Sequence, residues 1–591
     1  MLKRLLILVL VLSATPTARQ SETFIRASQL GYLPADPKIG TVFGSGPLPA
    51  ALEVVAEDGS VITRVDVTPR KGTWGRFDAF GDVDFSNVRR PGRYRLRVAG
   101  SELSSHPFTI GADVFTDAAD AMLEFMRSQR CGYNPFLDIV CHRFDGRTAD
   151  GPRPAGSFLP AHGGWHDAGD TLKYLITSSN ATAQLLLAYR LAPATWKDRV
   201  NALGQPGANG RPDILDEARW GLEWMLRLHP TSDELYHMVA DDRDHSGWRL
   251  PQDDASDYGW GTGSYRTVYF ATGAPQGLGK FKSESTGLAN IAGRYAAAMA
   301  LASQTLRDSP ADAAFARVCL QAAREVYALG RQKEGSQQGN SYGAPYRYNE
   351  TTWADDMEWG ATELHRATGE AQYLRDALRY AILAGAAGWM GRDTVQHYEY
   401  YPFMNLGHYR LHGLSAAGSV RGKVAAFYRE GLDATAAVAA ANPWRIGVPF
   451  IWCSNNLVVA LATQGELHER MTGDRGLRTF IVRQRDWLFG VNPWGISMFT
   501  GIGAEAPTDT HIPWFQLTGR RVPGGLVDGP VMASIFTSLK GVALSRPDRF
   551  DRFQSREAVY HDDWQDYSTN EPTMDGTASA ILLMALQSGR Q

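Results

Sequence analysis

The chain has 591 residues, of which 44% are hydrophobic and 21% charged, and its formal net charge is -3 at pH 7. This length exceeds one ordinary domain and is ample for a large buried core. The nearly balanced charge indicates neither a nucleic-acid partner nor binding to an anionic membrane surface.

The first 21 residues are typical of a signal peptide. Lys3 and Arg4 form a short basic region, and an apolar run follows from Leu5 to Ala14. Such a run is too short to span a bilayer, and no later apolar run is long enough to do so. The sequence therefore predicts export to the periplasm or the cell exterior, without membrane insertion. The alternative is a cytoplasmic protein with a frayed apolar N-terminus.

Residues 22–111 alternate between apolar and polar side chains in the manner of β-strands. Short β-rich runs at 52–55, 61–65 and 94–98 are separated by turn pairs such as Asp58-Gly59. Several short strands at this spacing indicate a small β-sandwich. Because the segment has no evident row of aromatic side chains, we expect it to pack against the rest of the chain rather than to bind a ligand alone.

From about residue 112, apolar residues recur every three or four positions, which is typical of amphipathic helices. Helical pairs without intervening strands favour a ring, the (α/α)6 barrel, over residues 112–591. The twelve expected helices lie near 114–130, 171–192, 212–229, 285–307, 311–331, 352–368, 371–390, 417–442, 453–472, 476–490, 530–546 and 572–588. Long connections of this kind are often functional. They are 143–163, 230–284, 391–416, 491–529 and 547–571.

Two acidic segments about 400 residues apart carry the clearest chemical signal. Residues 163–170 read Gly-Gly-Trp-His-Asp-Ala-Gly-Asp, and residues 561–571 read His-Asp-Asp-Trp-Gln-Asp-Tyr-Ser-Thr-Asn-Glu. Both place carboxylates among glycines, aromatics and amides rather than among lysines and arginines. Hydrolysis of a glycosidic bond needs two such carboxyls, one to protonate the leaving oxygen and one to activate water or attack carbon. The pattern therefore favours a glycosidase.

These segments resemble the motifs of glycoside hydrolase family 9. Residues 163–170 are similar to the family's N-terminal signature, and residues 563–571 to its C-terminal acidic motif, which ends in Asn-Glu. Residues 26–38 resemble the immunoglobulin-like module that precedes the catalytic domain. Segments 212–217 and 353–356 are also family-like. The resemblance implies an immunoglobulin-like β-sandwich followed by an (α/α)6 barrel.

The resemblance also implies the catalytic roles. Asp170 would be the general base, Asp167 its partner on the attacking water, and Glu571 the general acid. The family inverts configuration, so Asp170 and Glu571 are expected to stand about 6.5–9.5 Å apart. The structural alternatives are that Asp167 or Asp170 caps the next helix, and that Glu571 occupies the first turn of the last one.

Glu571 must hold its proton until attack, so its pKa is expected to lie above the usual value. The aspartates of residues 562–566 lie nearby in sequence and would supply like charge. Trp564 and Tyr567 would exclude water. We therefore expect the acidic motif itself to tune the general acid.

The region after residues 492–497 departs from the family pattern. Family endoglucanases usually carry a Pro-His-His-Arg run there, whereas residues 507–514 read Pro-Thr-Asp-Thr-His-Ile-Pro-Trp. His511 and Tyr567 match sugar-contacting residues of the family, but the arginine is absent. Trp514 is expected to close part of the cleft by stacking on a sugar, which would favour chain ends or short oligomers.

Cys131, Cys141, His142 and His166 form a second constellation. Thiolate and imidazole ligands suit tetrahedral zinc, and the resemblance implies a structural zinc at such positions in some family members. His166 directly precedes Asp167, so zinc there would brace the catalytic loop. The alternative in an exported protein is a disulfide between Cys131 and Cys141.

Calcium also occurs in the family, but its ligands are not assigned here. Asp355 and Asp356 offer carboxylates without a specific calcium-binding pattern. Cys319 and Cys453 lie in helical patterns and are expected to be buried small hydrophobes.

Together these observations predict a monomeric, exported, inverting β-glycoside hydrolase that cleaves β-1,4-glucan internally, with a polysaccharide or oligosaccharide as its partner. The nearest alternative is an exo-acting relative on cello- or amino-sugar oligosaccharides. A non-catalytic saccharide-binding protein is disfavoured because all three expected catalytic carboxyls are present. A polysaccharide lyase would need a Tyr or His base with basic residues facing a uronate, whereas this site is acidic.

Overall fold

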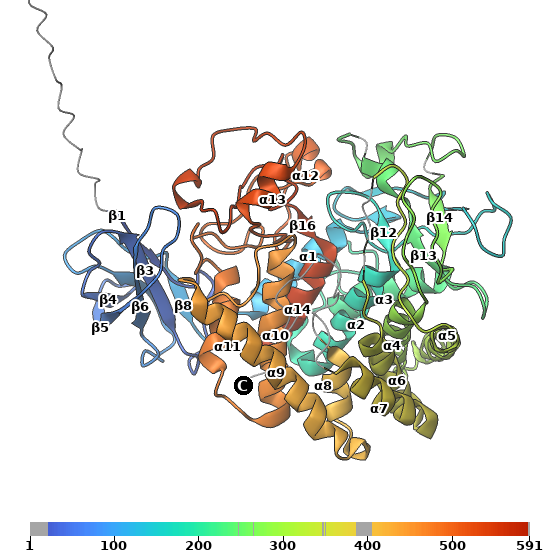
Figure 1. Ribbon diagram of the computed structural model, residues 1–591, viewed down its shortest axis with the longest axis horizontal. Coiled ribbons are helices and arrows are strands. Elements are labelled where there is room, and N and C mark those ends of the chain that lie inside the picture. Colours follow the sequence, from blue (N-terminus) through green and yellow to red (C-terminus); the bar gives the residue numbers. More distant parts are fainter. Residues whose placement is uncertain are drawn as a thin grey trace, which may run out of the picture.

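The computed structural model describes residues 22–245, 247–263, 265–344, 348, 350–385 and 405–588. Figure 1 shows a small β-sheet domain, in blue, beside a larger helical domain. The expected signal peptide and the last residues of the helix expected at 371–390 lie outside the described residues. Among the described helices, none combines the length and apolar character that a membrane span requires.

The N-terminal domain is the expected β-sandwich. Its strands are β1 Glu22–Arg26, β2 Gly31–Tyr32, β3 Ile39–Ser45, β4 Ala51–Ala56, β5 Val61–Arg70, β6 Ala79–Asp84, β7 Gly92–Arg97 and β8 Phe108–Ile110. They follow the order β1-β3-β6-β5-β4-β7-β8-β2. The long β5 serves both layers, because its first half pairs with β4 and its second half with β6. Alternate side chains point into a core that contains Val42, Leu52 and Leu96.

The helical domain is a ring of six helix pairs, which confirms the (α/α)6 barrel. The inner helices are α2 Leu175–Leu191, α4 Ala289–Leu306, α6 Ala354–Thr368, α8 Leu406–His412, α10 Ser454–Thr472 and α14 Met574–Ser588. The outer helices are α1 Thr116–Ser128, α3 Asp213–Arg227, α5 Ala313–Gln332, α7 Ala371–Ala384, α9 Val420–Ala441 and α11 Arg478–Leu488. Neighbouring inner helices contact each other around the ring, and α10 closes it on α14.

The residue pattern explains which helices lie inside. Residues 175–188 of α2 and 574–587 of α14 are buried without interruption, so protein surrounds these helices on every side. The outer helix α5 buries only a stripe of residues three or four positions apart: Ala316, Cys319, Ala322, Ala323, Val326, Tyr327 and Gly330. A helix with one apolar face can cover the inner ring while its other face stays in water.

One of the twelve expected helices is wrong, and one ring helix was not expected. The segment at 530–546 contains only α13 Ala533–Ser538, and none of its residues is buried. Because no residue of α13 is buried, packing does not stabilise a longer helix, and α13 stays short. The ring is instead completed by the inner helix α8, which lies within the expected connection 391–416. Its seven residues give too few turns for a periodic signal.

The connections also contain short strands, so the expectation of helices without strands was incomplete. A four-stranded sheet is formed by β11 Arg147–Thr148, β14 Thr267–Phe270, β13 Tyr236–Val239 and β12 Lys173–Tyr174. Two antiparallel pairs are formed by β9 Tyr133–Asn134 with β10 Ile139–Val140, and by β15 Leu526–Val527 with β16 Pro572–Thr573, which lies far along the chain. A short helix, α12 Pro513–Thr518, lies in the connection 491–529. These elements fix the chain just before α2 and α14.

A buried polar contact joins the sandwich to the barrel. Asp36, after β2, accepts hydrogen bonds from Arg478 at 2.5 Å and from Arg485 at 2.7 Å, both on α11. Burial alone would raise the pKa of Asp36, but the two guanidiniums lower it to about 2. The indole of Trp74 adds a hydrogen bond to the carbonyl of Phe553 at 2.8 Å. The N-terminal domain therefore packs on the barrel, as expected.

Candidate active site

The two acidic segments meet at one point. The backbone N–H of Gly169 donates to Oε1 of Glu571 at 2.8 Å, across 402 positions of sequence. A Cβ at residue 169 would lie 2.2 Å from the carbonyl oxygen of His511 and 2.7 Å from Oε1 of Glu571. Glycine is therefore required for this close approach.

Asp167 is buried and held by two hydroxyl groups. Thr177 on α2 donates to its Oδ1 at 2.8 Å, and the phenol of Tyr348 donates to its Oδ2. Burial, followed by the charges of Asp575 and Asp170, raises the pKa of Asp167 well above its usual value. Tyr348 was not among the expected site residues, because no motif around it marks it.

Asp170 keeps part of its carboxylate accessible, with a side chain that is 11% exposed. Its Oδ1 accepts the N–H of Leu172 at 3.0 Å, and its Oδ2 lies 3.4 Å from Nε2 of His245. Asp170 does not cap a helix, because α2 begins only at Leu175. An accessible carboxylate beside an imidazole suits proton transfer. The sequence did not single out His245, which lies in the connection 230–284.

Glu571 lies just before β16 and does not occupy the first turn of α14, which begins at Met574. Burial, followed by the charges of Asp528 and Asp170, raises the pKa of Glu571 well above its usual value. A raised pKa keeps a carboxyl protonated toward neutral pH, which a general acid requires. Asp528 is the third site residue, after Tyr348 and His245, that the sequence did not mark.

The aspartates of residues 562–566 have other partners, so the expectation that they tune Glu571 was wrong. Each carboxylate is engaged by a nearby donor: Asp562 by Arg549 at 3.0 Å, Asp563 by the Ser545 hydroxyl at 2.8 Å, and Asp566 by His561 at 2.7 Å. These contacts hold the loop that leads to Glu571. The charges that act most on Glu571 come from other segments of the chain.

A row of partly exposed aromatic rings lies beside the carboxyls. The aromatic row is Trp564, Trp248, His511, Tyr567 and Trp452, with successive ring centroids 5.0, 4.9, 5.7 and 5.8 Å apart. The carbonyl of Trp564 lies 2.7 Å from Nδ1 of His511 and fixes that ring. His511 and Tyr567 were expected as substrate contacts, whereas Trp248 and Trp452 were not. Their signal was only the aromatic content of their segments.

Trp514 does not line the site, which corrects the expectation that it closes the cleft. Its side chain is 0% exposed and packs in a small core with Phe125, Ile512 and Phe515. Its ring also lies 5.7 Å from that of His166. A ring without exposed surface has no face to offer a sugar.

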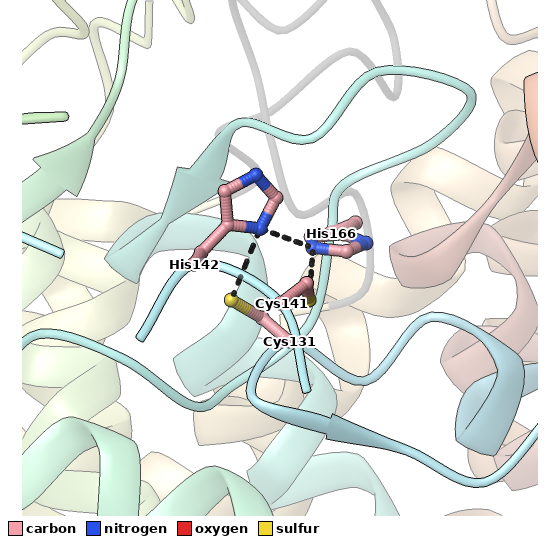
Figure 2. Close-up of side chains that lie close together, drawn as sticks. All are labelled: Cys131, Cys141, His142 and His166. Carbon is pink, nitrogen blue, oxygen red and sulfur yellow. Dashed lines mark hydrogen bonds between the residues drawn. The ribbon is translucent and has the colours of Figure 1, made fainter. Parts of the chain in front are cut away.

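The four expected metal ligands do come together. Figure 2 shows the side chains of Cys131, Cys141, His142 and His166 pointing toward one another. Their ligand atoms all lie within 4.8 Å of each other, and all four residues are buried. Both cysteines are free thiols, so the structure does not contain the alternative disulfide. Lys173 donates to Sγ of Cys131 at 3.3 Å.

The spacing of these atoms fits zinc. Sγ of Cys131 lies 3.8 Å from Nδ1 of His142, Sγ of Cys141 lies 3.8 Å from Nε2 of His166, and the two ring nitrogens are 3.4 Å apart. Tetrahedral zinc with bonds of about 2.0–2.3 Å places its ligands roughly 3.3–3.8 Å apart. The other nitrogen of His142 lies 3.3 Å from Asp254, the kind of contact that orients a ligating histidine.

The remaining candidates of the sequence have simpler surroundings. Asp356 pairs with the buried Arg294 at 2.7 Å, a cation that it shares with Glu350. Among the described residues, the possible metal ligands gather at the Cys/His group, so calcium gains no support at Asp356. Cys319 is buried within α5, as expected. Cys453 is buried too, but it precedes α10, and its thiol lies 3.1 Å from Oδ1 of Asp528.

Comparison with known proteins covers both domains. The model of glycosyl hydrolase family 9 matches residues 115–584, and that of the cellulase N-terminal Ig-like domain matches residues 20–102. Endoglucanase C of Cellulomonas fimi is 28% identical over 93% of this chain. The chain spans 50% of the length of that relative.

Solved structures show the same arrangement. A metagenome-derived family 9 endoglucanase has a TM-score of 0.77 at 28% identity, covering 96% of this chain and 99% of its own. A Zn-binding triple mutant of another family 9 endoglucanase has a TM-score of 0.73 at 26% identity, covering 94% and 99%. The two acidic motifs, the helical ring and the matched domains lead to one conclusion: the chain belongs to glycosyl hydrolase family 9.

Proposed function

We propose that the protein is an inverting β-glycoside hydrolase that cleaves internal β-1,4 linkages of glucan chains. The observation that carries the proposal is the contact between Gly169 and Glu571, because it joins the loop of Asp167 and Asp170 to a buried carboxyl whose pKa is raised. Family membership and the similarity to endoglucanases support the same reaction. The expected export would bring such an enzyme to polymers outside the cytoplasm.

In this proposal the two carboxyls act on opposite sides of the scissile bond. Asp170 takes a proton from a water molecule as its oxygen attacks the anomeric carbon, and Asp167 holds the same water as a second acceptor. Glu571 gives its proton to the leaving glycosidic oxygen as the C–O bond breaks. Attack by water on the far face inverts the configuration at the anomeric carbon.

The aromatic row is the proposed surface for the sugar rings. Sugar faces are apolar enough to stack on aromatic side chains, and this row is partly exposed beside the reacting groups. His511 and Tyr567 are the proposed contacts at the cleavage point, as the family resemblance implies. Trp514 is left out because it is buried.

We further propose that Cys131, Cys141, His142 and His166 hold a structural zinc ion. Four protein ligands close the coordination sphere, so zinc here would supply folding energy and no reaction chemistry. Its effect on the reaction would be indirect, through the position of the loop that carries Asp167 and Asp170.

Hydrolysis of a panel of soluble substrates tests the reaction class. The purified full chain should cleave soluble β-1,4-glucans better than chito-oligosaccharides, and proton NMR of early products should show the α-anomer. An initial β-anomer would mean a covalent intermediate and would remove Asp170 as the base. Binding of glucan without any product would instead indicate a saccharide-binding protein, and unsaturated products would indicate a lyase.

A further inference from the structure

Asp528 stands directly across a β-ladder from Glu571. β15 and β16 pair antiparallel, with Val527 opposite Pro572. The next opposite pair in this register is Asp528 and Glu571, and the N–H of Asp528 donates to the carbonyl of Glu571 at 2.9 Å. Side chains directly opposite in such a ladder leave the same face, with Cβ atoms about 4.5–5.5 Å apart.

The start of α10 fixes Asp528 in this place. The carbonyl of Asp528 accepts the N–H of Asn455 at 2.9 Å, and the Asn455 amide donates to the carbonyl of Val527 at 2.9 Å. A Cβ at Gly529 would lie 2.4 Å from the Asn455 side chain, so the backbone is tightly packed there. Asp528 is 1% exposed and cannot turn its carboxylate to solvent.

Neutral donors surround the Asp528 carboxylate. The thiol of Cys453 lies 3.1 Å from its Oδ1, and the Trp452 side chain also forms a hydrogen bond with it. An indole N–H can only donate, so the carboxylate must accept. No cation is among the groups that act most strongly on Asp528. Burial and the charges of Asp575 and Asp566 raise the pKa of Asp528 above its usual value, and the bonds from Cys453 and Trp452 act against that rise.

The backbone conformation of Cys453 also supports a role for its contact with Asp528. Its φ is 54°, in the left-handed region that glycine enters at little cost and other residues enter rarely. A residue other than glycine is strained at this φ, and the side chain that glycine would lack is the one that contacts Asp528.

We propose that Asp528 is a positioning residue: a buried carboxylate opposite Glu571 that keeps the general acid protonated and thereby sets the upper pH limit of hydrolysis. The inference rests on the proposed function, since it requires Glu571 to be the acid. Two carboxyls this close do not ionise independently. The charge of the pair goes to Asp528 because the side chains of Cys453 and Trp452 both donate to its carboxylate, whereas the backbone N–H of Gly169 donates to Glu571, which keeps the proton.

Other titratable groups face the pair. They are Asp167 and Asp170 from the acidic loop, Asp566 and Tyr567 from the C-terminal motif, Asp575 from α14, and His511 near Asp170. All of them remain when Asp528 alone is changed, so a difference in pH dependence reports the Asp528 charge.

The test is the pH dependence of kcat/KM for the wild-type chain and for Asp528→Asn, each normalised to its own maximum. Asparagine keeps the shape and an acceptor for Cys453 but carries no charge. Removing a like charge makes Glu571 ionise at lower pH. The basic limb of the profile should therefore move down by about one to two pH units, while the acidic limb stays in place.

Three further variants separate charge from packing. Asp528→Glu keeps a charge and should leave the basic limb near its wild-type position. Cys453→Ala removes a donor and should move the limb in the same direction as Asp528→Asn, but by less. Cys319→Ala changes a buried cysteine on the outer ring and should not move it.

If the basic limb of the Asp528→Asn profile coincides with the wild-type limb, the inference about Asp528 is overturned, while the proposed function is unaffected. Thermal unfolding shows whether Asp528→Asn folds. If it does not, Cys453→Ala carries the test, and an unmoved limb in that variant overturns the inference. A wild-type chain that hydrolyses no glucan overturns the proposed function and this inference together.

Discussion

Asp170 and Glu571 have different surroundings, and this difference suits different roles. Glu571 is withdrawn from water beside Asp528 and Asp170, and its pKa is raised. Asp170 is partly exposed and lies beside His245. Two carboxyls whose environments push their protonation apart are the usual basis of an acid and base pair.

Replacing either carboxyl by its amide should nearly abolish hydrolysis. Asp170→Asn removes the acceptor for the water proton, and Glu571→Gln removes the proton donor, so each should lower kcat by roughly 10²–10⁴-fold or more. Release of reducing sugar from soluble glucan measures the effect. Asp563→Asn is the matched control, because this carboxylate contacts Ser545 and should leave most of the activity. Either amide variant within tenfold of the wild-type rate would contradict the assignment.

At the scale of elements, the four metal ligands tie three segments together. Cys131 follows α1, Cys141 and His142 follow β10, and His166 lies in the loop before α2. Residues 166–172 of that loop are neither helix nor strand, so a shared ion would be an effective brace. The ligands are not expected acids or bases.

The purified chain should contain about one zinc ion, measured by elemental analysis. Cys141→Ala should lose the ion and lower the melting temperature by several degrees, because structural zinc contributes several kcal/mol to folding. Cys319→Ala is the control for loss of a buried thiol and should retain zinc. A chain without zinc, in which Cys131 and Cys141 are joined with sulfurs about 2.05 Å apart, would disprove the metal site.

At the scale of the whole molecule, the sandwich and the barrel share a buried ion cluster. Asp36 contacts Arg478 and Arg485, and the side chains of all three are at most 5% exposed. Removal of this aspartate takes away the carboxylate that the two guanidiniums share, while Arg478 keeps Glu466 and Arg485 keeps Asp486. The N-terminal domain therefore contributes to the stability of the catalytic domain.

Asp36→Ala should destabilise the protein by about 1.5–3 kcal/mol, the usual contribution of hydrogen bonds to charged groups, because each arginine keeps another acidic partner. Asp433→Ala is the control: it removes an exposed partner of Arg429 on α9 and should cost less than about 1 kcal/mol. The folded pKa of Asp36, about 2, lies below the ordinary value, so its stabilisation is present above pH ~4 and is lost as pH falls through 2. Thermal unfolding at pH 7 and pH 3 should show the difference between Asp36→Ala and wild type shrinking in acid. Equal stability of Asp36→Ala and wild type at pH 7 would contradict a stabilising role of Asp36.

The mode of attack on the polymer is a second property of the whole molecule. The sequence predicted internal cleavage and left an exo-acting enzyme as the alternative, partly because Trp514 would narrow the cleft, but Trp514 is buried. We therefore expect internal cleavage. The viscosity of a soluble glucan should fall steeply at few cleavages, measured against release of reducing ends. Slow viscosity loss with steady release of one small product would instead support an exo-acting enzyme.

The sequence by itself determined the features that depend on neighbouring residues. Alternation over 22–111 predicted the sandwich, and the three-to-four spacing in segments such as 311–331 predicted helices of the barrel, here the outer helix α5. The acidic motifs identified the family, because their chemistry lies in short contiguous runs. The four candidate metal ligands came from their residue types together with the family resemblance, because their spacing in sequence is a weak signal, and the structure brings them together.

Only the tertiary structure decided which side chains meet and which are covered. It placed Asp528 opposite Glu571 and left the aspartates of 562–566 to bind other partners. It buried Trp514 and brought Trp248 to His511. It also formed α8, whose two turns are stabilised by neighbouring helices. Burial and the proximity of like charges depend on contacts between segments far apart in sequence, and a local sequence pattern does not predict those contacts.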